Sequence, residues 1–381
     1  MIKVLHVSQA REYSGAEIVL ANILRHNSFW QASVIVPEGP FSELLNKLGV
    51  CTIEAKYLSN IKRKKNFFWP VIFLFKFVLA SLEVMRAVKS YKPDIIYANH
   101  LSAAPYCLLA KLIYRKRFIW HMHDIHKAGS LESFSASFIS KFSDKIIAIS
   151  DAVKKALIKS GINPGKIVRC YNGIDKKDCF TDTFDEQIKI IKEKEIINIA
   201  QIGLLEPRKG VDIFIKAANI LLTEIKSKQR IRFYIVGETI AHPEYVEEIK
   251  NLVKNLKLEE NIIFTGRLKN MKYVYQNIDI AVQASRTPEP FGMVVLEAMV
   301  MGALAVGTNI GAIPEIIDDG KTGLLFSPDD PQDLSNKLSA IINREIDVQQ
   351  ILKNAEQKAI NQFSLDKQKQ CLYETIKSVV T

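Results

Sequence analysis

Two successive series of short apolar segments, each alternating with helical stretches, constrain the fold of this 381-residue chain most. In the first half, strands are expected at 3–8, 32–37, 94–99, 117–122, 145–150 and 166–170. Most of these segments are apolar almost throughout, which is typical of parallel strands covered on both faces. Helical patterns lie between them, at 16–26, 101–114 and 151–160. The alternation predicts a doubly wound α/β unit with a parallel sheet.

A second unit of the same kind follows a polar, charged stretch at 175–195, which we interpret as the interdomain connection. Its strands are expected at 196–203, 231–237, 261–266, 279–285, 303–308 and 322–326, and residues 330–381 are expected to be helical. The length of the chain also favours two domains, which we place at 1–180 and 181–362. Ligands of such sheets bind at the carboxyl ends of the strands, so a central cleft between the domains is expected.

The turn after the first strand argues against a nicotinamide dinucleotide site. Such a site needs a G-x-G-x-x-G sequence at this place, with an acidic residue about 20 positions further on. Residues 9–15 read QAREYSG and contain one glycine, Gly15. A dehydrogenase is therefore not expected.

The cysteines and the first residues bear on the cellular compartment. The five cysteines are scattered and lack paired metal-ligand spacing: Cys51, Cys107, Cys170, Cys179 and Cys371. This pattern favours a reducing compartment and argues against a disulfide framework or a structural zinc. The chain enters an apolar strand at once and shows no signal-peptide pattern, so a cytoplasmic location is expected.

A net charge of +11 and a pI near 9.2 predict an anionic partner. Residues 61–92 carry eight Lys or Arg and one acidic residue, Glu83, which gives this segment a net charge of +7. Basic residues followed by Phe67, Phe68 and Trp69 and an apolar stretch favour insertion at an anionic membrane surface. The apolar stretch is too short to span a bilayer. The alternative is a buried helix that covers a sheet, with solvated basic ends.

Residues 286–326 carry the most informative chemistry. Gly292 permits a tight turn, and a helix is expected over 293–301, whose first backbone N–H groups suit a diphosphate. Glu289 lies just before this turn and can reach sugar hydroxyls. Glu297 lies about one turn inside the helix, where a carboxylate can accept hydrogen bonds from a ribose. The alternative is that both acids only complement the helix N-terminus.

Two further elements carry candidate side chains. Arg208 and Lys209 lie in a loop between a strand and a helix. Two cations at such a place can stabilise a departing diphosphate. The alternative is that both are solvated residues of a surface loop. The strand at 117–122 ends near His121, His123, Asp124 and His126, which suggests zinc at first sight. The spacing of these residues is not that of a zinc site, so no metal is expected.

Together these residues resemble those of the retaining glycosyltransferases of family 4, the bacterial-type group 1 enzymes, over nearly the whole chain. The most specific feature is the E-x7-E motif, EPFGMVVLE at 289–297. Supporting features are Lys209-Gly210, SGAE at 14–17, HD at 123–124, NGID at 172–175, and the GAIPEII and TGLLF segments of 311–326. The resemblance implies the GT-B fold, in which two doubly wound parallel-sheet domains face a central cleft.

The resemblance also implies roles for single residues. It makes His123, Lys209 and Glu289 the catalytic residues, with His123 near the sugar on the face where the acceptor enters. It assigns donor binding to a larger set: Gly15, Arg208, Lys209, Gly266, Arg267, Glu289, Phe291, Gly292, Met293, Val294 and Glu297. Residues 264–267 would border the base, and a final helix near 363–381 would pack back on the first domain.

Two positions depart from the family pattern. Many members carry arginine where this chain has Leu204, so Arg208 is expected to supply that charge. The first glycine-rich loop is usually Gly-Gly, whereas here it is Ser14-Gly15. Gly15 still allows close approach of the backbone to a ligand.

The implied activity is retaining transfer of a hexose from a nucleotide-diphosphate sugar to a hydroxyl acceptor. No Asp-x-Asp pair follows a strand to hold a divalent ion, so no metal and no further cofactor are expected. The basic-aromatic segment favours a glycolipid or polysaccharide precursor at the cytoplasmic membrane face. A nucleic acid is not expected, because the basic residues adjoin a long apolar run rather than isolated stacking aromatics. A sugar-nucleotide epimerase and a catalytically silent sugar-nucleotide binder remain as alternatives.

Overall fold

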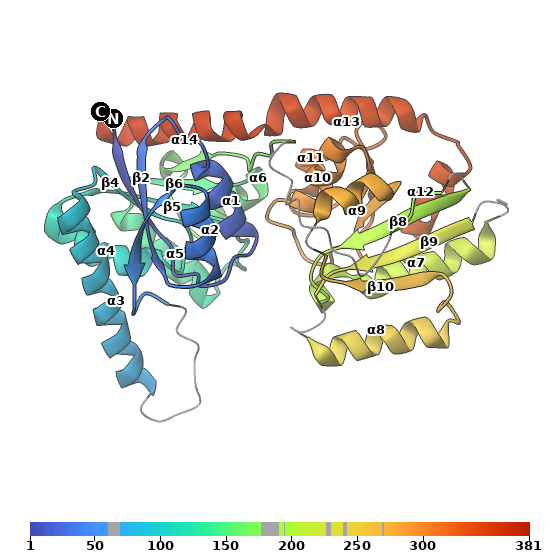
Figure 1. Ribbon diagram of the computed structural model, residues 1–381, viewed down its shortest axis with the longest axis horizontal. Coiled ribbons are helices and arrows are strands. Elements are labelled where there is room, and N and C mark those ends of the chain that lie inside the picture. The colour runs from blue at the N-terminus through green and yellow to red at the C-terminus, as the bar shows by residue number, and fades with distance from the viewer. Residues whose placement is uncertain (60–68, 177–189, 194, 226–229, 239–241, 269) are drawn as a thin grey trace. The chain divides into compact units, whose positions relative to one another are not determined.

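The computed structural model describes residues 1–59, 69–176, 190–193, 195–225, 230–238, 242–268 and 270–381 (Figure 1). These residues form two compact units. Unit 1 contains Met1–Gly173 and Leu365–Thr381, and unit 2 contains Ile174–Ser364. The expected connection at 175–195 lies largely outside the described residues.

Unit 1 contains a seven-stranded sheet in the order β3-β2-β1-β4-β5-β6-β7, with all neighbouring strands parallel. Its strands are β1 (Lys3–Val7), β2 (Gln31–Pro37), β3 (Cys51–Ala55), β4 (Ile95–Ala98), β5 (Arg117–Met122), β6 (Lys145–Ala148) and β7 (Ile167–Arg169). The chain order reverses between β1 and β4. Parallel strands of this kind need crossover helices on both faces of the sheet, which explains why the strand interiors are apolar on both sides.

The helices of unit 1 are α1 (Gly15–Leu24), α2 (Pro40–Lys47), α3 (Trp69–Tyr91), α4 (Ala104–Tyr114), α5 (Leu131–Phe142), α6 (Asp151–Lys159) and α14 (Leu365–Val380), with a short 3₁₀ turn, η1 (Pro164–Lys166). Right-handed crossovers place α1 and α2 on one face of the sheet and α3 to α6 on the other. Neighbouring helices of the second group pack in chain order, and α14 packs against α1. No helix among the described residues is long and apolar enough to cross a membrane.

The last helix is bound to unit 1 by polar contacts and by a covalent bond. The side chain of Gln368 accepts a hydrogen bond from the backbone N–H of Gly173 at 2.8 Å, and Lys369 donates to the carbonyl of Arg25 at 2.8 Å. Cys170 at the end of β7 and Cys371 on α14 form a disulfide. The expectation of no disulfide is therefore wrong for this pair, because two cysteines 201 positions apart in the sequence meet only in the folded chain.

Unit 2 contains a six-stranded parallel sheet in the order β10-β9-β8-β11-β12-β13. Its strands are β8 (Ile196–Ile202), β9 (Arg230–Val236), β10 (Ile262–Gly266), β11 (Ile280–Gln283), β12 (Leu304–Thr308) and β13 (Leu324–Phe326). Its helices are η2 (Pro207–Lys209), α7 (Val211–Glu224), α8 (Pro243–Asn255), α9 (Met271–Asn277), α10 (Met293–Met301), α11 (Ile313–Ile316), α12 (Pro331–Ile342) and α13 (Val348–Phe363). The chain order reverses between β8 and β11, so the loops that follow these two strands diverge from a shared edge.

The fold class predicted from the sequence is confirmed, and each predicted strand overlaps an observed one. β3 is the strand that the prediction missed. It is a short edge strand of sequence CTIEA, and most of its residues are at least partly exposed. It therefore lacks the continuous apolar run of the inner strands. β2 pairs with it from Ser33 to Pro37, and this pairing defines it as a strand.

Candidate active site

The loop that carries Arg208 and Lys209 is fixed against the end of β11. Gly210 has a φ of +63°, and a Cβ at this position would lie 2.0 Å from the carbonyl oxygen of Ala284. This close approach requires glycine. The side chain of Gln201, in β8, donates to the carbonyl of Lys209 at 2.8 Å. Lys209 is thus held at the carboxyl edge of the sheet, next to the loop that follows β11.

Lys209 and Glu289 form an ion pair in this loop region. The Lys209 Nζ lies 2.6 Å from the Glu289 Oε1, and the hydroxyl of Ser285 donates to the same oxygen at 2.6 Å. Arg208 is more distant from this carboxylate, at 3.9 Å, and pairs with Glu206 at 2.7 Å. The two cations and Glu289 that the sequence singled out are therefore in one cluster.

The charge of Glu289 is held by this cluster. The side chain is buried, and burial acts to raise the pKa of its carboxyl. The ion pair with Lys209, the hydrogen bond from Ser285 and the charge of Arg208 outweigh this effect and keep the pKa below its usual value. Glu289 is an ionised acceptor, suited to hydroxyl groups of a sugar.

Glu297 lies in a different environment, one turn inside α10. Tyr275 on α9 donates a hydrogen bond to its Oε2 at 2.7 Å. Burial raises the pKa of the Glu297 carboxyl to about 7, although the Tyr275 hydrogen bond acts in the opposite direction. No cation is among the causes of this shift. The Glu297 carboxyl therefore changes its charge near neutral pH.

The start of α10 has the geometry of an anion site. Gly292 is the N-cap residue, with a φ of +112° and no side chain to cap the helix. The first backbone N–H groups of the helix, those of Met293 and Val294, belong to the set that has no partner within a helix. Phe291, which was expected to bind the donor, has a buried side chain that packs against the ring of Phe363 on α13.

Gly266 and Arg267 lie at the carboxyl end of β10. The Gly266 carbonyl accepts a hydrogen bond from Gly237 at 3.0 Å, which links the ends of β9 and β10. Arg267 is exposed and lies 3.7 Å from Glu238. These two residues are at the same edge of the sheet as Lys209 but take part in a separate set of contacts.

Arg286 is a functional candidate to which no role was assigned from the sequence. Its guanidinium binds both carboxylate oxygens of Asp212, at 2.9 and 2.7 Å, and its Nε lies 2.6 Å from Asp329. Its backbone N–H also donates to the carbonyl of Arg208 at 2.8 Å. Arg286 thereby fixes the Arg208–Lys209 loop relative to the loop of Glu289. Ser285 and Tyr275 were also missed, and no sequence pattern marks any of these three pairings.

In unit 1, His123 follows β5 at the carboxyl edge of the sheet. It is buried, and its Nε2 has no hydrogen-bond partner among the residues that the structure describes. Burial, followed by the neighbouring His121 and His100, lowers the pKa of His123 well below its usual value. The ring also interacts with the backbone of Asn99, which follows β4. A neutral imidazole with an unpartnered nitrogen at this edge is suited to hydrogen-bonding a ligand hydroxyl.

The neighbouring His100 and Asp124 form a close pair. The His100 Nε2 lies 2.6 Å from an Asp124 carboxylate oxygen, while its Nδ1 accepts from the backbone N–H of Ser102 at 3.2 Å. His100 therefore donates through Nε2. This hydrogen bond is the first cause that lowers the pKa of Asp124. Asp124 is a fixed anion beside His123.

His121 has a separate contact. His121 pairs with the hydroxyl of Tyr97 at 2.8 Å. The described residues contain no group of three or more His, Cys, Asp or Glu side chains arranged to hold a metal ion.

Gly15 is the first residue of α1, at the same edge of the sheet. A Cβ added to it would meet no atom within 4 Å, so its surroundings are open. Ser14 and Glu17 form a capping box at this helix start. The side-chain amide of Asn99 reaches the carbonyl of Ala16 at 3.5 Å, which links the start of α1 to the end of β4 near His123.

Comparison with known proteins gives two adjacent family matches. Residues 13–178 match the family described as Glycosyltransferase Family 4, and residues 181–358 match Glycosyl transferases group 1. An uncharacterized 41.2 kDa protein in the cps region of Klebsiella pneumoniae is 24% identical over 365 residues, which cover 90% of this chain and 89% of that protein. The N-acetyl-α-D-glucosaminyl L-malate synthase of Bacillus anthracis is 29% identical over 284 residues, or 72% of each chain.

Solved structures are similar to this chain over nearly its whole length. The crystal structure of Anabaena HepE in complex with UDP has a TM-score of 0.83 at 25% identity, with 99% of this chain and 100% of HepE covered. A glycosyltransferase from Rickettsia africae has a TM-score of 0.83 at 22% identity, with 100% of this chain and 99% of that chain covered, which shows a shared fold.

Proposed function

Because this chain belongs to the group 1 glycosyltransferases of family 4 and has their GT-B fold, we propose that it transfers a hexose from a nucleoside-diphosphate sugar to a hydroxyl acceptor with retention of anomeric configuration. The observation that carries the proposal is the cluster of Lys209, Glu289 and Ser285 beside the start of α10. A nucleoside diphosphate, a glycosylated acceptor and a proton would be the products.

The donor diphosphate is proposed to bind between the cations and the helix start. Lys209 and Arg208 would neutralise the charge that develops on the leaving diphosphate, and the first N–H groups of α10 would hydrogen-bond its oxygens. This stabilisation uses fixed protein charges, so we propose that no divalent metal is needed. HepE, a similar protein, has been solved with UDP, which supports a nucleotide donor.

The two glutamates would bind two other parts of the donor, the transferred sugar and the ribose. Glu289 is ionised and buried next to Lys209, so it suits the hydroxyls of the transferred sugar. Glu297 would accept hydrogen bonds from the ribose hydroxyls. These would replace or add to the hydrogen bond that it accepts from Tyr275. His123 would hydrogen-bond a sugar hydroxyl through its unpartnered Nε2.

The acceptor is proposed to be a glycolipid or polysaccharide precursor at the cytoplasmic face of the membrane. The net charge of +7 in residues 61–92 supports an anionic membrane partner. Residues 60–68 of that segment lie outside the described part of the structure. Similarity to a protein from a cps region and to the serotype-specific mannosyltransferase WbdA of Escherichia coli, at 28% identity over 209 residues, also favours this acceptor class.

The proposal is tested with purified protein and a panel of UDP-, GDP-, ADP- and CMP-sugars. We expect the sugar donors of one nucleotide class to raise the thermal midpoint of the wild type. We also expect the protein to hydrolyse these donors slowly or to transfer their sugar slowly. Lys209→Ala should lower turnover by about 100-fold or more, because it removes a charge that acts on the leaving group. Lys254→Ala, an exposed lysine on α8, is the matched control and should retain wild-type turnover.

The products separate the competing activities. A new glycosidic bond that retains the anomeric configuration of the donor supports the proposal. An epimerised sugar, or donor binding without turnover with any acceptor, would contradict it. Near wild-type turnover of Lys209→Ala would remove Lys209 from the mechanism.

A further inference from the structure

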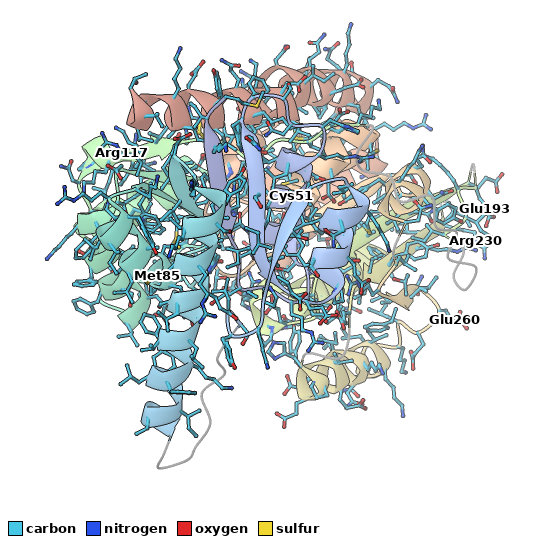
Figure 2. All side chains as sticks on the ribbon, turned by 60° about the vertical axis from the view of Figure 1, so that its left-hand side comes forward. Cys51, Met85, Arg117, Glu193, Arg230 and Glu260 are labelled. Carbon is cyan, nitrogen blue, oxygen red and sulfur yellow. A yellow bond between two sulfur atoms is a disulfide. The ribbon has the colours of Figure 1, made fainter. Side chains whose placement is uncertain are left out.

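The first half of α3 exposes large apolar side chains to solvent. Val71, Leu74 and Phe75 are 68%, 61% and 63% exposed, and Val78 and Leu82 continue the same face of the helix. In Figure 2 the first turns of α3, at the lower end of the helix that leads up to Met85, stand clear of the other elements of unit 1. Apolar surface of this kind is rare on a protein that works alone in water.

The next two helices expose apolar stripes of their own. On α4, Leu109, Leu112 and Ile113 are exposed at helical spacing. On α5, Leu131 and Phe134 are 78% and 66% exposed, and Phe138 lies one turn further on. Neither stripe was apparent from the sequence, because both helices also carry the apolar residues of their buried sides.

The three stripes lie on neighbouring helices. α3 packs along α4, and α4 packs against α5, all on one face of the sheet. On α3 the residues opposite the stripe, Ala80, Val84 and Val88, are buried toward the sheet. We call the combined outer surface of these stripes on α3, α4 and α5 the three-helix face.

The segment that forms the three-helix face is basic. Residues 69–142 contain ten Lys or Arg and four Asp or Glu, a net charge of +6. Lys76 and Arg86 on α3, Arg115 after α4 and Lys141 on α5 are exposed. Exposed apolar residues on a basic segment match the chemistry of an anionic bilayer surface, where acyl chains meet phosphate groups.

Two other occupants fit the three-helix face less well. The exposed apolar part of α3 is shorter than the roughly 20 residues that a membrane span needs, and the described residues contain no such span. A second copy of this chain would bring the same basic segment against itself in a symmetric interface, and that repulsion disfavours a dimer.

We propose that the three-helix face docks the protein on a lipid bilayer with anionic headgroups, with the stripes of all three helices inserted at the interface. α5 starts eight residues after His123, and the first turns of α3 and α5 both lie at the carboxyl edge of the sheet. Docking would therefore bring this edge to the membrane surface. The docking surface deepens the anionic membrane partner of the proposed function, but it does not depend on the proposed transfer activity.

The test measures flotation of the full chain with phosphatidylcholine vesicles that contain or lack phosphatidylglycerol. The wild type should float with the anionic vesicles and bind more weakly to neutral ones. Leu74→Ser with Phe75→Ser on α3, and separately Phe134→Ser with Phe138→Ser on α5, should each weaken binding by at least about 10-fold, because each pair removes two large inserted side chains. Ile360→Ser, an exposed apolar residue on α13, is the control and should bind as the wild type does.

The α5 variant decides the proposal. If the α5 variant binds vesicles as tightly as the wild type does, the three-helix face is not the docking surface. Equal binding of the wild type to neutral and anionic vesicles would also contradict the proposal. A wild-type dimer that the α5 variant converts to a monomer would assign the face to a second copy instead. Thermal stabilisation by a nucleotide sugar is measured on the same samples. It should be unchanged in all variants, so failure of docking is distinguished from failure of the proposed activity.

Discussion

At the scale of single residues, the two glutamates of the E-x7-E loop have opposite electrostatic surroundings. Glu289 has Lys209 at 2.6 Å, and its pKa is held below the usual value. Glu297 has a tyrosine hydroxyl as its partner, and burial raises its pKa to about 7. One carboxylate is thus ionised throughout the physiological range, while the other changes charge within it.

The raised pKa of Glu297 predicts a specific dependence of stability on pH. The folded protein holds the Glu297 proton up to about pH 7, whereas the unfolded chain releases it near 4.5. Stability should therefore fall as the pH rises from about 4.5 to 7, by up to about 3 kcal/mol, and then level off. Urea unfolding of wild type and Glu297→Gln at pH 5 and pH 8 checks this. The variant should gain stability relative to the wild type only at pH 8.

Tyr275→Phe tests the cause of this dependence. It removes the one hydrogen bond that lowers the pKa of Glu297, so the pH midpoint of the stability change should move above 7. An unchanged midpoint would mean that the hydroxyl does not bind the carboxylate in solution.

At the scale of elements, the loops around β8 and β11 depend on close backbone contacts. Gly311 has a φ of +67°, and a Cβ there would lie 2.4 Å from the backbone nitrogen of Glu289. The N–H of Ala312 donates to the carbonyl of Glu289 at 2.9 Å. The loop after β12 therefore supports the loop that carries Glu289.

Gly311→Ala should displace Glu289, so we expect turnover to fall at least about 10-fold, given how sensitive catalysis is to small misplacements. Gly302→Ala is the matched control, because Gly302 also has a positive φ, of +83°, but a Cβ there meets nothing within 4 Å. The control should lose about 1 kcal/mol of stability from backbone strain and keep its turnover. Equal turnover of the two variants would show that the Gly311 contact does not position Glu289.

Arg286 joins three segments of unit 2 by its side chain. Arg286→Lys keeps the charge but loses the bidentate contact with Asp212 at 2.9 and 2.7 Å. The Arg286 guanidinium also donates to the carbonyl of Pro207 at 3.2 Å, next to Arg208. We expect weaker binding of the nucleotide donor, by several-fold, because the Arg208–Lys209 loop loses this side-chain contact. Calorimetric titration measures this, with Arg232→Lys on β9 as the control. Unchanged donor affinity in Arg286→Lys would contradict a positioning role.

At the scale of the whole molecule, one covalent bond joins distant parts of the chain. Cys170 and Cys371 are 201 positions apart and link β7 to α14 within unit 1. Reduction, or Cys371→Ser, should lower the unfolding free energy by about 2–4 kcal/mol, since the unfolded chain gains freedom. Cys51→Ser, at an exposed free cysteine, is the control. Peptide mapping of unreduced protein should recover the Cys170–Cys371 pair, and its absence would contradict the bond.

Local sequence patterns determined most of the architecture. The apolar runs predicted both parallel sheets, because strands buried on two faces must be apolar throughout. The start of α10 at Met293 was also predicted, since Gly292 interrupts the preceding loop and an apolar helical run follows. The edge strand β3 was not, because its exposed residues break the apolar pattern that marks a buried strand.

The residues of the candidate site were found by type and order, while their partners came only from the tertiary structure. Lys209 and Glu289 are 80 positions apart, and Tyr275 and Glu297 are 22 apart. The sequence places Lys209 and Glu289 in loops that follow strands and Glu297 one turn inside a helix, because those positions depend on local periodicity. Which side chains meet, which cysteines bond and which helix faces stay exposed depend on how the elements pack, and packing is a property of the whole chain.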